Sequence, residues 1–348
     1  MKIFHNTRHA EHAGRQEMFR GRMVDCHESP ARLQHVLDEL ARRPVGELLT
    51  PAADLPLDAA LQRVHSPEYL QFLANAWDEW VAMDPANATR DALPSVWPLA
   101  QPHAFRTDKP PLNFAARLGQ YAFDSGTPLM AGSWAAARQG AACALAAAQA
   151  VLAGEHSAMA LTRPPGHHAG PAFMGGYCFI NNGAVAAQAL RDGGLQRVAV
   201  LDVDYHHGNG TQTIFYERSD VLTVSIHAHP ERYYPFFWGY PDERGKGAGE
   251  GANLNLCLER GTGDAGFMAA LEAGMQAIAN WGADTLVLAL GLDAFEGDPF
   301  AGLAVTTPGF GQIGRAVAAM GLPVLIVQEG GYLCPELGDN LEAVLRGF

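Results

Sequence analysis

Short apolar runs and longer amphipathic segments alternate along most of the chain. Six apolar runs predict strands, at 2–5, 158–161, 198–204, 221–227, 285–290 and 324–329. Helical periodicity predicts helices at 30–42, 67–82, 134–153, 182–192, 266–280 and 309–320. Strands that alternate with helices indicate βαβ units, and strands without polar alternation are typical of a sheet covered on both faces. We therefore predict a single α/β domain over residues 1–348, a parallel central sheet flanked by helices, with an active site at the carboxyl ends of the strands.

One segment does not follow this alternation. Residues 84–111 contain six prolines and show no helical period, and the irregular region extends to about residue 128. Loops of this length in a compact domain usually bind something or cover a site. We treat residues 84–130 as one long loop insertion.

Composition narrows the class of protein. The formal net charge of −13 disfavours nucleic acid as a partner, because such binding needs clustered Lys and Arg. The acidity weakly favours cationic substrates, although it also simply keeps a protein soluble. Five dispersed cysteines without a Cys-x-x-Cys pair indicate reduced thiols, and the N-terminus lacks an apolar signal segment. We expect a cytoplasmic protein that does not bind membranes.

Two strand ends carry potential metal ligands. Asp204 and His206 follow the apolar run 198–201, and in an extended strand two residues at this spacing point the same way. Asp293 follows the run 285–290 in the same manner. If these strands are parallel neighbours, the three side chains form a site of the catalytic zinc type, with one position open for water or substrate. The alternative is that each Asp only caps a following helix. Such a ligand set also suits iron or cobalt.

These motifs resemble the histone-deacetylase superfamily, whose zinc amidohydrolases share a fold with arginases. The resemblance rests on Arg163-Pro-Pro-Gly-His-His-Ala-Gly170, Leu201-Asp-Val-Asp-Tyr-His-His-Gly-Asn-Gly210, Gly291-Leu-Asp293 and Glu329-Gly-Gly-Tyr332. Within the superfamily, Gly175-Gly-Tyr-Cys-Phe-Ile-Asn-Asn182 and Gly239-Tyr-Pro-Asp-Glu-Arg-Gly-Lys-Gly247 are most similar to the bacterial acetylpolyamine amidohydrolases. The resemblance runs from about residue 2 to the C-terminus. It implies an arginase/deacetylase-like fold and hydrolysis of acetyl groups from N-acetylated amines.

The resemblance also implies catalytic roles. His168 would be the general base on water and then the acid to the amine, with His167 holding charge beside it. Asp202 can accept a hydrogen bond from His167, and Asn209 can do so from His168. Because a neutral amide orients an imidazole without raising its basicity, Asn209 predicts a less basic His168. Tyr332, freed to turn inward by two glycines, would stabilise the oxyanion, although a Tyr packed at a strand end is the simpler interpretation of that residue alone.

Further sites follow from the same resemblance. The substrate channel would contain Gly176, Tyr177 and Tyr234, with Gly176 leaving room for the substrate to approach closely. Two structural potassium ions are implied, the first bound by Asp202, Asp204, His206, Ser225 and Ile226, and the second by Phe215, Arg218 and Val221. The 84–130 loop would build a homodimer and narrow the mouth of the site.

The chain also departs from the polyamine-directed pattern. Ala115 and Gly126 stand where that branch has carboxylates to receive a cationic tail, and the nearby Asp124 is a potential substitute. Alternatives are therefore a lysine deacetylase acting on peptides or proteins, a two-metal ureohydrolase, or a metal-binding protein without catalysis. His9 and His12 have the spacing of a ligand pair but no strong third ligand, so we expect them at the surface.

Overall fold

The computed structural model describes residues 1–97, 109, 111–300 and 302–348. An eight-stranded parallel sheet forms its centre, in the order β4-β1-β5-β10-β9-β6-β7-β8. Its strands are β1 (Lys2–His5), β4 (Glu47–Leu49), β5 (Ser157–Leu161), β6 (Val198–Asp202), β7 (Val221–Ala228), β8 (Asn253–Leu258), β9 (Thr285–Leu290) and β10 (Val324–Gln328). β2 (Gln16–Phe19) and β3 (Arg22–Asp25) form a separate antiparallel hairpin. The predicted α/β architecture is confirmed.

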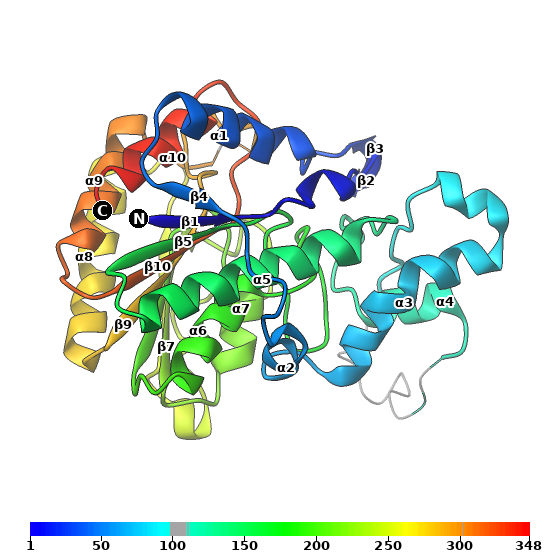
Figure 1. Ribbon diagram of the computed structural model, residues 1–348, viewed down its shortest axis with the longest axis horizontal. Helices are drawn as coiled ribbons and strands as arrows, with labels where there is room; N and C mark the ends of the chain where they lie inside the picture. Colours follow the sequence, from blue (N-terminus) through cyan, green and yellow to red (C-terminus); the bar gives the residue numbers. More distant parts are fainter. Residues whose placement is uncertain (98–108, 110, 301) are drawn as a thin grey trace.

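Helices cover both faces of the sheet (Figure 1). They are α1 (Pro30–Arg42), α2 (Leu57–Gln62), α3 (Pro67–Met83), α4 (Phe114–Gln120), α5 (Ser133–Leu152), α6 (Asn182–Asp192), α7 (Asn209–Phe215), α8 (Asp264–Trp281), α9 (Thr307–Ala318) and α10 (Leu337–Leu345). Short 3₁₀ helices span His9–Glu11, Pro85–Thr89 and Gly247–Gly249. None of the helices in the described part of the chain has the length and apolar character that a bilayer crossing requires.

The two apolar cores explain why the strands lack polar alternation. Ala158 and Ala160 of β5 pack in one core, beneath α5 and α6. Met159 and Leu161 point the opposite way, into a second core built with α1, α8, α9 and α10. Because successive side chains of a strand alternate between faces, a sheet buried on both sides needs an apolar residue at every position.

The apolar pattern missed the β2–β3 hairpin and two strands of the central sheet, and these two lie at the edges of that sheet. β4 has three residues and is largely exposed, so its sequence lacks an apolar run. In β8, Asn253 and Asn255 alternate with leucines. Both Asn side chains are buried, and both donate hydrogen bonds to the side chain of Gln212. Polar groups can be buried when they are hydrogen-bonded. A buried strand that contains such residues is not an apolar run, so the apolar pattern does not predict it.

Part of the predicted irregular segment is ordered helix, so that interpretation of residues 84–128 was wrong in part. Pro85–Thr89 and α4 are helical, and the side chain of Asn113 caps α4 by accepting the amide of Ala116 at 3.2 Å. Phe114 is buried and packs against Phe72 of α3. Residues 98–108 and 110 of the predicted loop lie outside the described residues.

The expectation that His9 and His12 lie at the surface was also wrong. His12 is 3% exposed, and its Nδ1 lies 3.0 Å from the hydroxyl of Ser133. The backbone carbonyls of both histidines accept hydrogen bonds from the buried guanidinium of Arg163. Glu28 neutralises that guanidinium, so this polar cluster is an internal support for the loop that begins at Arg163.

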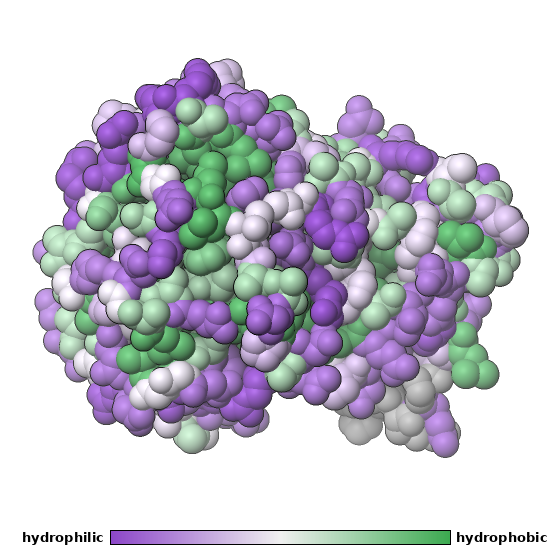
Figure 2. All heavy atoms as spheres, in the orientation of Figure 1, coloured by the Kyte–Doolittle hydropathy of each residue, from purple (hydrophilic) through white to green (hydrophobic). Residues whose placement is uncertain are grey.

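Figure 1 shows the β2–β3 hairpin, α3 and α4 beyond the carboxyl ends of the strands. The face seen in this view carries mainly hydrophilic side chains with smaller apolar groups among them (Figure 2). The fold therefore places additional elements at the edge of the sheet where ligands of parallel α/β proteins bind.

Candidate active site

Four motifs that are scattered along the sequence converge at one edge of the sheet. They follow β5, β10, β9 and β6, which are neighbours in this order. β6 and β9 pair in parallel, with Asp202 beside Ala289, so Asp204 and Asp293 leave adjacent strands. The predicted neighbourhood of these strands is confirmed.

Asp204, His206 and Asp293 form a compact ligand group. One donor atom from each lies within 4.8 Å of the others. Nδ1 of His206 is 3.3 Å from Oδ1 of Asp204 and 3.1 Å from Oδ2 of Asp293. Both carboxylates are fully buried, and a Cβ at Gly330 would lie 2.3 Å from Asp293 Oδ2 and 2.5 Å from Asp204 Oδ2. The glycine thus leaves the space that the two carboxylates need.

The electrostatics of this group favour a cation. Burial opposes a charged imidazole, but hydrogen bonds and charges from Asp204 and Asp293 outweigh it and raise the pKa of His206 to about 9. Burial also raises the pKa of Asp293, to which the nearby charge of Asp204 adds. Two buried carboxylates and one imidazole fit a divalent metal ion, which would compensate their charge better than a proton.

The local conformation of the ligand segment differs from the prediction. The strand ends at Asp202 rather than 204, and Asp204 and His206 lie in a bend. Oδ1 of Asp204 accepts the backbone amide of His206 at 2.8 Å, which turns the chain. The two side chains therefore converge through this turn and not through the two-residue period of a strand.

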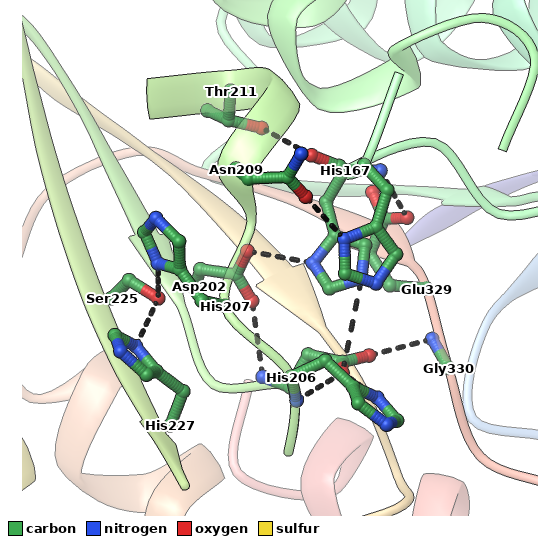
Figure 3. A network of polar contacts seen from close by, with 12 residues as sticks. His167, Asp202, His206, His207, Asn209, Thr211, Ser225, His227, Glu329 and Gly330 are labelled. Carbon is green, nitrogen blue, oxygen red and sulfur yellow. Dashed lines mark hydrogen bonds and ion pairs between the residues drawn. The ribbon is translucent and has the colours of Figure 1, made fainter. Parts of the chain in front are cut away.

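The adjacent histidines have different partners. Nδ1 of His167 lies 2.9 Å from Oδ2 of Asp202 (Figure 3), whereas Nδ1 of His168 lies 2.7 Å from Oδ1 of Asn209. The two rings are 4.0 Å apart. Since the amide oxygen of Asn209 only accepts, Nδ1 of His168 carries the proton and Nε2 is the basic nitrogen.

The partners separate the two pKa values. Burial lowers the pKa of His167, but the charges of Asp204 and Asp202 outweigh it and raise the value to about 10. For His168, burial and the neighbouring charges of His167 and His206 lower the pKa well below its ordinary value. These shifts favour a protonated His167, which lies beside two carboxylates, and a neutral His168.

Glu329 is a buried acid that the sequence analysis did not assign to the site. Its Oε2 accepts the backbone amide of His167 at 3.0 Å (Figure 3). The same oxygen accepts the backbone amide of Gly166 at 2.6 Å. Burial raises the pKa of Glu329 to about 7, against the opposing charge of His167. The sequence contained one signal for this role of Glu329, because a charged residue stands directly after the apolar strand 324–328. Glu329 anchors the loop that carries both histidines.

Tyr332 turns inward after Gly331, whose φ is +106°. The backbone amide of Tyr332 donates to Oδ2 of Asp298 at 2.8 Å, and the ring packs edge-on against Phe300 at 4.4 Å. The guanidinium of Arg32 lies 4.8 Å from the ring centroid. Burial raises the pKa of Tyr332 well above its ordinary value, so the phenol keeps its proton as a hydrogen-bond donor.

His168, His206 and Tyr332 line a common cavity of about 520 Å³. A large part of its wall is aromatic, formed by Phe19, Phe123, Tyr177, Tyr205, Tyr233, Tyr234, Phe236, Phe237 and Phe300. Of these, Phe123 stacks on Tyr234 at 5.7 Å, a contact that no sequence motif indicated. An aromatic channel that ends at polar groups suits an alkyl chain with one reactive polar end.

Gly176, Tyr177 and Tyr234 all line this cavity, as the resemblance implied. The expected reason for Gly176 needs correction, because its missing side chain makes room for His168 and not only for a substrate. A Cβ there would lie 2.1 Å from Cδ2 of His168, and its φ is +54°. Tyr177 donates its hydroxyl to Oε1 of Glu17 at 2.9 Å.

The residues predicted to bind potassium lie beside the histidine loop and at the start of β7. Asp202 and Ser225 are register partners on β6 and β7, and the Ser225 hydroxyl contacts the histidines 207 and 227 (Figure 3). Phe215 ends α7, Arg218 donates its backbone amide to the Phe215 carbonyl at 2.9 Å, and Val221 begins β7. Ion binding by either set stays a prediction.

The sequence and the structure are both similar to those of known deacetylases. The family model described as "Histone deacetylase domain" matches residues 26–348. Acetylpolyamine amidohydrolase 2 of Pseudomonas aeruginosa is 43% identical over 348 residues, covering 100% of this chain and 98% of that protein. Acetylpolyamine amidohydrolase of Mycoplana ramosa is 40% identical over 347 residues, covering 100% and 99%. The crystal structure of acetylpolyamine aminohydrolase from Burkholderia pseudomallei superposes with a TM-score of 0.93 at 38% identity, covering 100% of this chain and 98% of that one.

Proposed function

The chain belongs to the histone deacetylase family and is a deacetylase of the amidohydrolase type, and on this basis we propose that it removes acetyl groups from small N-acetylated amines. Acetylated diamines and polyamines belong to this class, and the names of the relatives point to it. The observation that carries the proposal is the convergence of His168, His206 and Tyr332 on one aromatic cavity.

The donor set supports a zinc ion, or iron or cobalt in its place, bound by Asp204, His206 and Asp293. Such an ion, when bound, would polarise the acyl oxygen and lower the pKa of water to about 7. The two carboxylates are held by contacts outside the group, since Asp204 accepts the amide of Gly330 at 2.8 Å and Asp293 that of Tyr205 at 2.9 Å. These contacts orient the ligands before an ion arrives.

His168 takes the proton of the attacking water on Nε2 and later returns it to the departing amine. The lowered pKa of His168 keeps its imidazole neutral at neutral pH, and the Asn209 contact at Nδ1 leaves Nε2 to accept the proton. His167 stays protonated beside Asp202, and its charge stabilises negative charge that develops on the substrate. Asn209 keeps the acceptor nitrogen of His168 directed toward the cavity.

Tyr332 donates its phenolic proton to the acyl oxygen as that oxygen becomes negative. The buried ring is clamped by Phe300 and Arg32, so little reorganisation is needed when charge develops. Tyr177 and Tyr234 flank the alkyl chain of the substrate, with their hydroxyls engaged by Glu17 and Asp124. The apolar ring faces are then left for the chain.

Two finer features extend the proposal. Structural potassium ions at the two predicted sets would bind through backbone carbonyls and the Ser225 hydroxyl near Asp202. A homodimer formed through residues 84–130 would add a second copy near the mouth of the cavity, where Val96 is part of the wall. Size-exclusion chromatography with light scattering tests the homodimer directly.

Acetate release from a small panel tests the proposed function. N-acetylputrescine, a neutral N-alkylacetamide and an acetyllysine peptide are compared, each with zinc, iron or cobalt added to metal-free protein. We expect small acetylated amines to be hydrolysed faster than the peptide. Preference for the peptide would instead favour a lysine deacetylase, and no acetate from any substrate would refute the proposal.

A further inference from the structure

The charged side chains that line the cavity, outside the ligand group, are mostly cationic. In the described part of the chain they are Arg20, Arg232 and Asp124. Both arginines are exposed residues at the cavity, and none of the ion pairs found within the described ranges includes either of them. A guanidinium stays charged at all relevant pH values and binds carboxylates well.

Arg20 is held at the cavity by an unusual turn. Phe19 and Arg22 are register partners of the β2–β3 hairpin, so Arg20 and Gly21 form its two-residue tip. Their φ angles are +50° and +78°, a conformation that favours Asn-Gly and disfavours Arg. The Arg20 guanidinium lies 4.9 Å from the ring centroid of Phe19, which also lines the cavity. Other residues adopt this backbone conformation more easily than arginine does. The presence of an arginine here therefore indicates that its side chain has a function.

Asp124 places one negative charge in this wall against the two arginines, and hydrogen-bond donors already occupy both of its oxygens. Oδ2 accepts the amide of Gly176 at 2.6 Å and the hydroxyl of Tyr234 at 2.7 Å. Oδ1 accepts the amide of Gly126 at 3.2 Å and the hydroxyl of Thr127 at 2.9 Å. A carboxylate has about four acceptor sites, so Asp124 is committed to the wall of the cavity.

Ala115 and Gly126 contribute no charge to the cavity either. Gly126 lines the cavity without a side chain. Ala115 is an exposed residue of α4 and does not line it. A second ammonium group on a substrate would therefore meet two guanidinium groups, and Asp124, the one carboxylate outside the ligand group among the described lining residues, has no free acceptor position for it.

We propose that this cavity selects N-acetylated amines whose far end carries a carboxylate, such as N-acetylated ω-amino acids, over those that end in an ammonium group. The proposal rests on the proposed function, since it concerns which amides the same site hydrolyses. Exposed charges contribute modestly each, so we expect a preference of about 3- to 30-fold in kcat/KM at low salt.

Three substrates of matched length test the selectivity. N-acetylputrescine, N-pentylacetamide and 5-acetamidopentanoate share the acetamide and the methylene chain, and differ in an ammonium, methyl or carboxylate end. We expect kcat/KM to rise from the ammonium to the methyl and the carboxylate substrate. We also expect the ratio of the first to the last to approach one as salt is raised to about 0.5 M. The salt series uses the wild-type protein and needs no variant.

Charge reversal tests the two arginines. Arg20→Glu with Arg232→Glu should invert the order, so that N-acetylputrescine becomes the best of the three. Arg22→Glu, on the same hairpin but not part of the cavity wall, is the matched control and should keep the wild-type order. Wild-type preference for N-acetylputrescine, or an unchanged order in the double variant, would overturn the inference while leaving the deacetylase proposal intact. If the wild-type protein hydrolysed none of the three substrates, the proposed function itself would be refuted.

Discussion

Nδ1 of His168 lies 2.7 Å from Oδ1 of Asn209, so the imidazole is oriented by a neutral group. Its neighbour His167 faces the carboxylate of Asp202 at the same ring position. The charge of Asp204 near His167, this difference of one functional group, and the charges of His167 and His206 near His168 separate the pKa values of the two buried histidines.

Asn209→Asp should shift the pH profile. A carboxylate beside His168 favours its protonated form and raises its pKa, and a base must be deprotonated to act. The acidic limb of kcat/KM should therefore move to higher pH by about 1 unit or more, with activity lost at low pH first. Asn209→Ala, which removes the partner without adding charge, is the control and should lower activity without this shift. An identical acidic limb in Asn209→Asp and wild type would contradict the assignment of His168 as base.

Tyr332→Phe should lower kcat by about 10²- to 10³-fold, because it removes one preorganised donor to the developing oxyanion. The melting temperature and the KM should change little, since the ring contacts to Phe300 and Arg32 remain. Tyr216→Phe, which does not line the cavity, serves as the control. Wild-type kcat in Tyr332→Phe would show that the oxyanion is stabilised by other groups.

Metal removal should abolish acetate release, and one equivalent of zinc, iron or cobalt per chain should restore it. The expectation rests on the single group of three ligand donors found among the described residues. Asp293→Asn should reduce metal content measured by mass spectrometry, because it removes one of two anionic ligands. About two ions per chain would instead favour the two-metal ureohydrolase alternative.

Glu329→Gln should flatten the dependence of stability on pH in the metal-free protein. The folded-state pKa of Glu329 is raised from 4.5 to about 7, so its stabilisation is complete below pH 4.5 and is lost as pH rises through 7. The loss is on the order of 3 kcal/mol in the free energy of unfolding. Urea unfolding at pH 5 and pH 8 measures it, with the exposed Glu217→Gln as control. If the free energy of unfolding changed equally between pH 5 and pH 8 in Glu329→Gln and wild type, the raised pKa of Glu329 would be contradicted.

Gly176→Ala should lower activity, because the added Cβ would lie 2.1 Å from the His168 ring and displace it. We expect kcat to fall by more than about tenfold, in line with the cost of misplacing a catalytic group. Gly247→Ala separates this effect from backbone strain, since Gly247 has a similar φ of +58° and a Cβ added there would have no atom within 4 Å. Equal activity losses in both variants would mean that strain alone is responsible.

The sequence by itself determined the central strands and the ligand segments that follow them. Apolar runs identify strands buried on both faces, and parallel strands bring Asp204 and Asp293 to one edge of the sheet. The partners of His167 and His168 were predictable as well, because Asp202 and Asn209 belong to the same motif.

Only the tertiary structure decided which distant side chains meet the motifs. Glu329 reaches the amide of His167 across 162 residues of sequence, and Asp124 reaches the hydroxyl of Tyr234 across 110. The turn that brings Asp204 and His206 together, and the hairpin tip that directs Arg20 to the cavity, depend on backbone conformations without an apolar signature. Apolar periodicity reports burial, whereas side-chain partners depend on direction and distance, which arise only when the chain is packed.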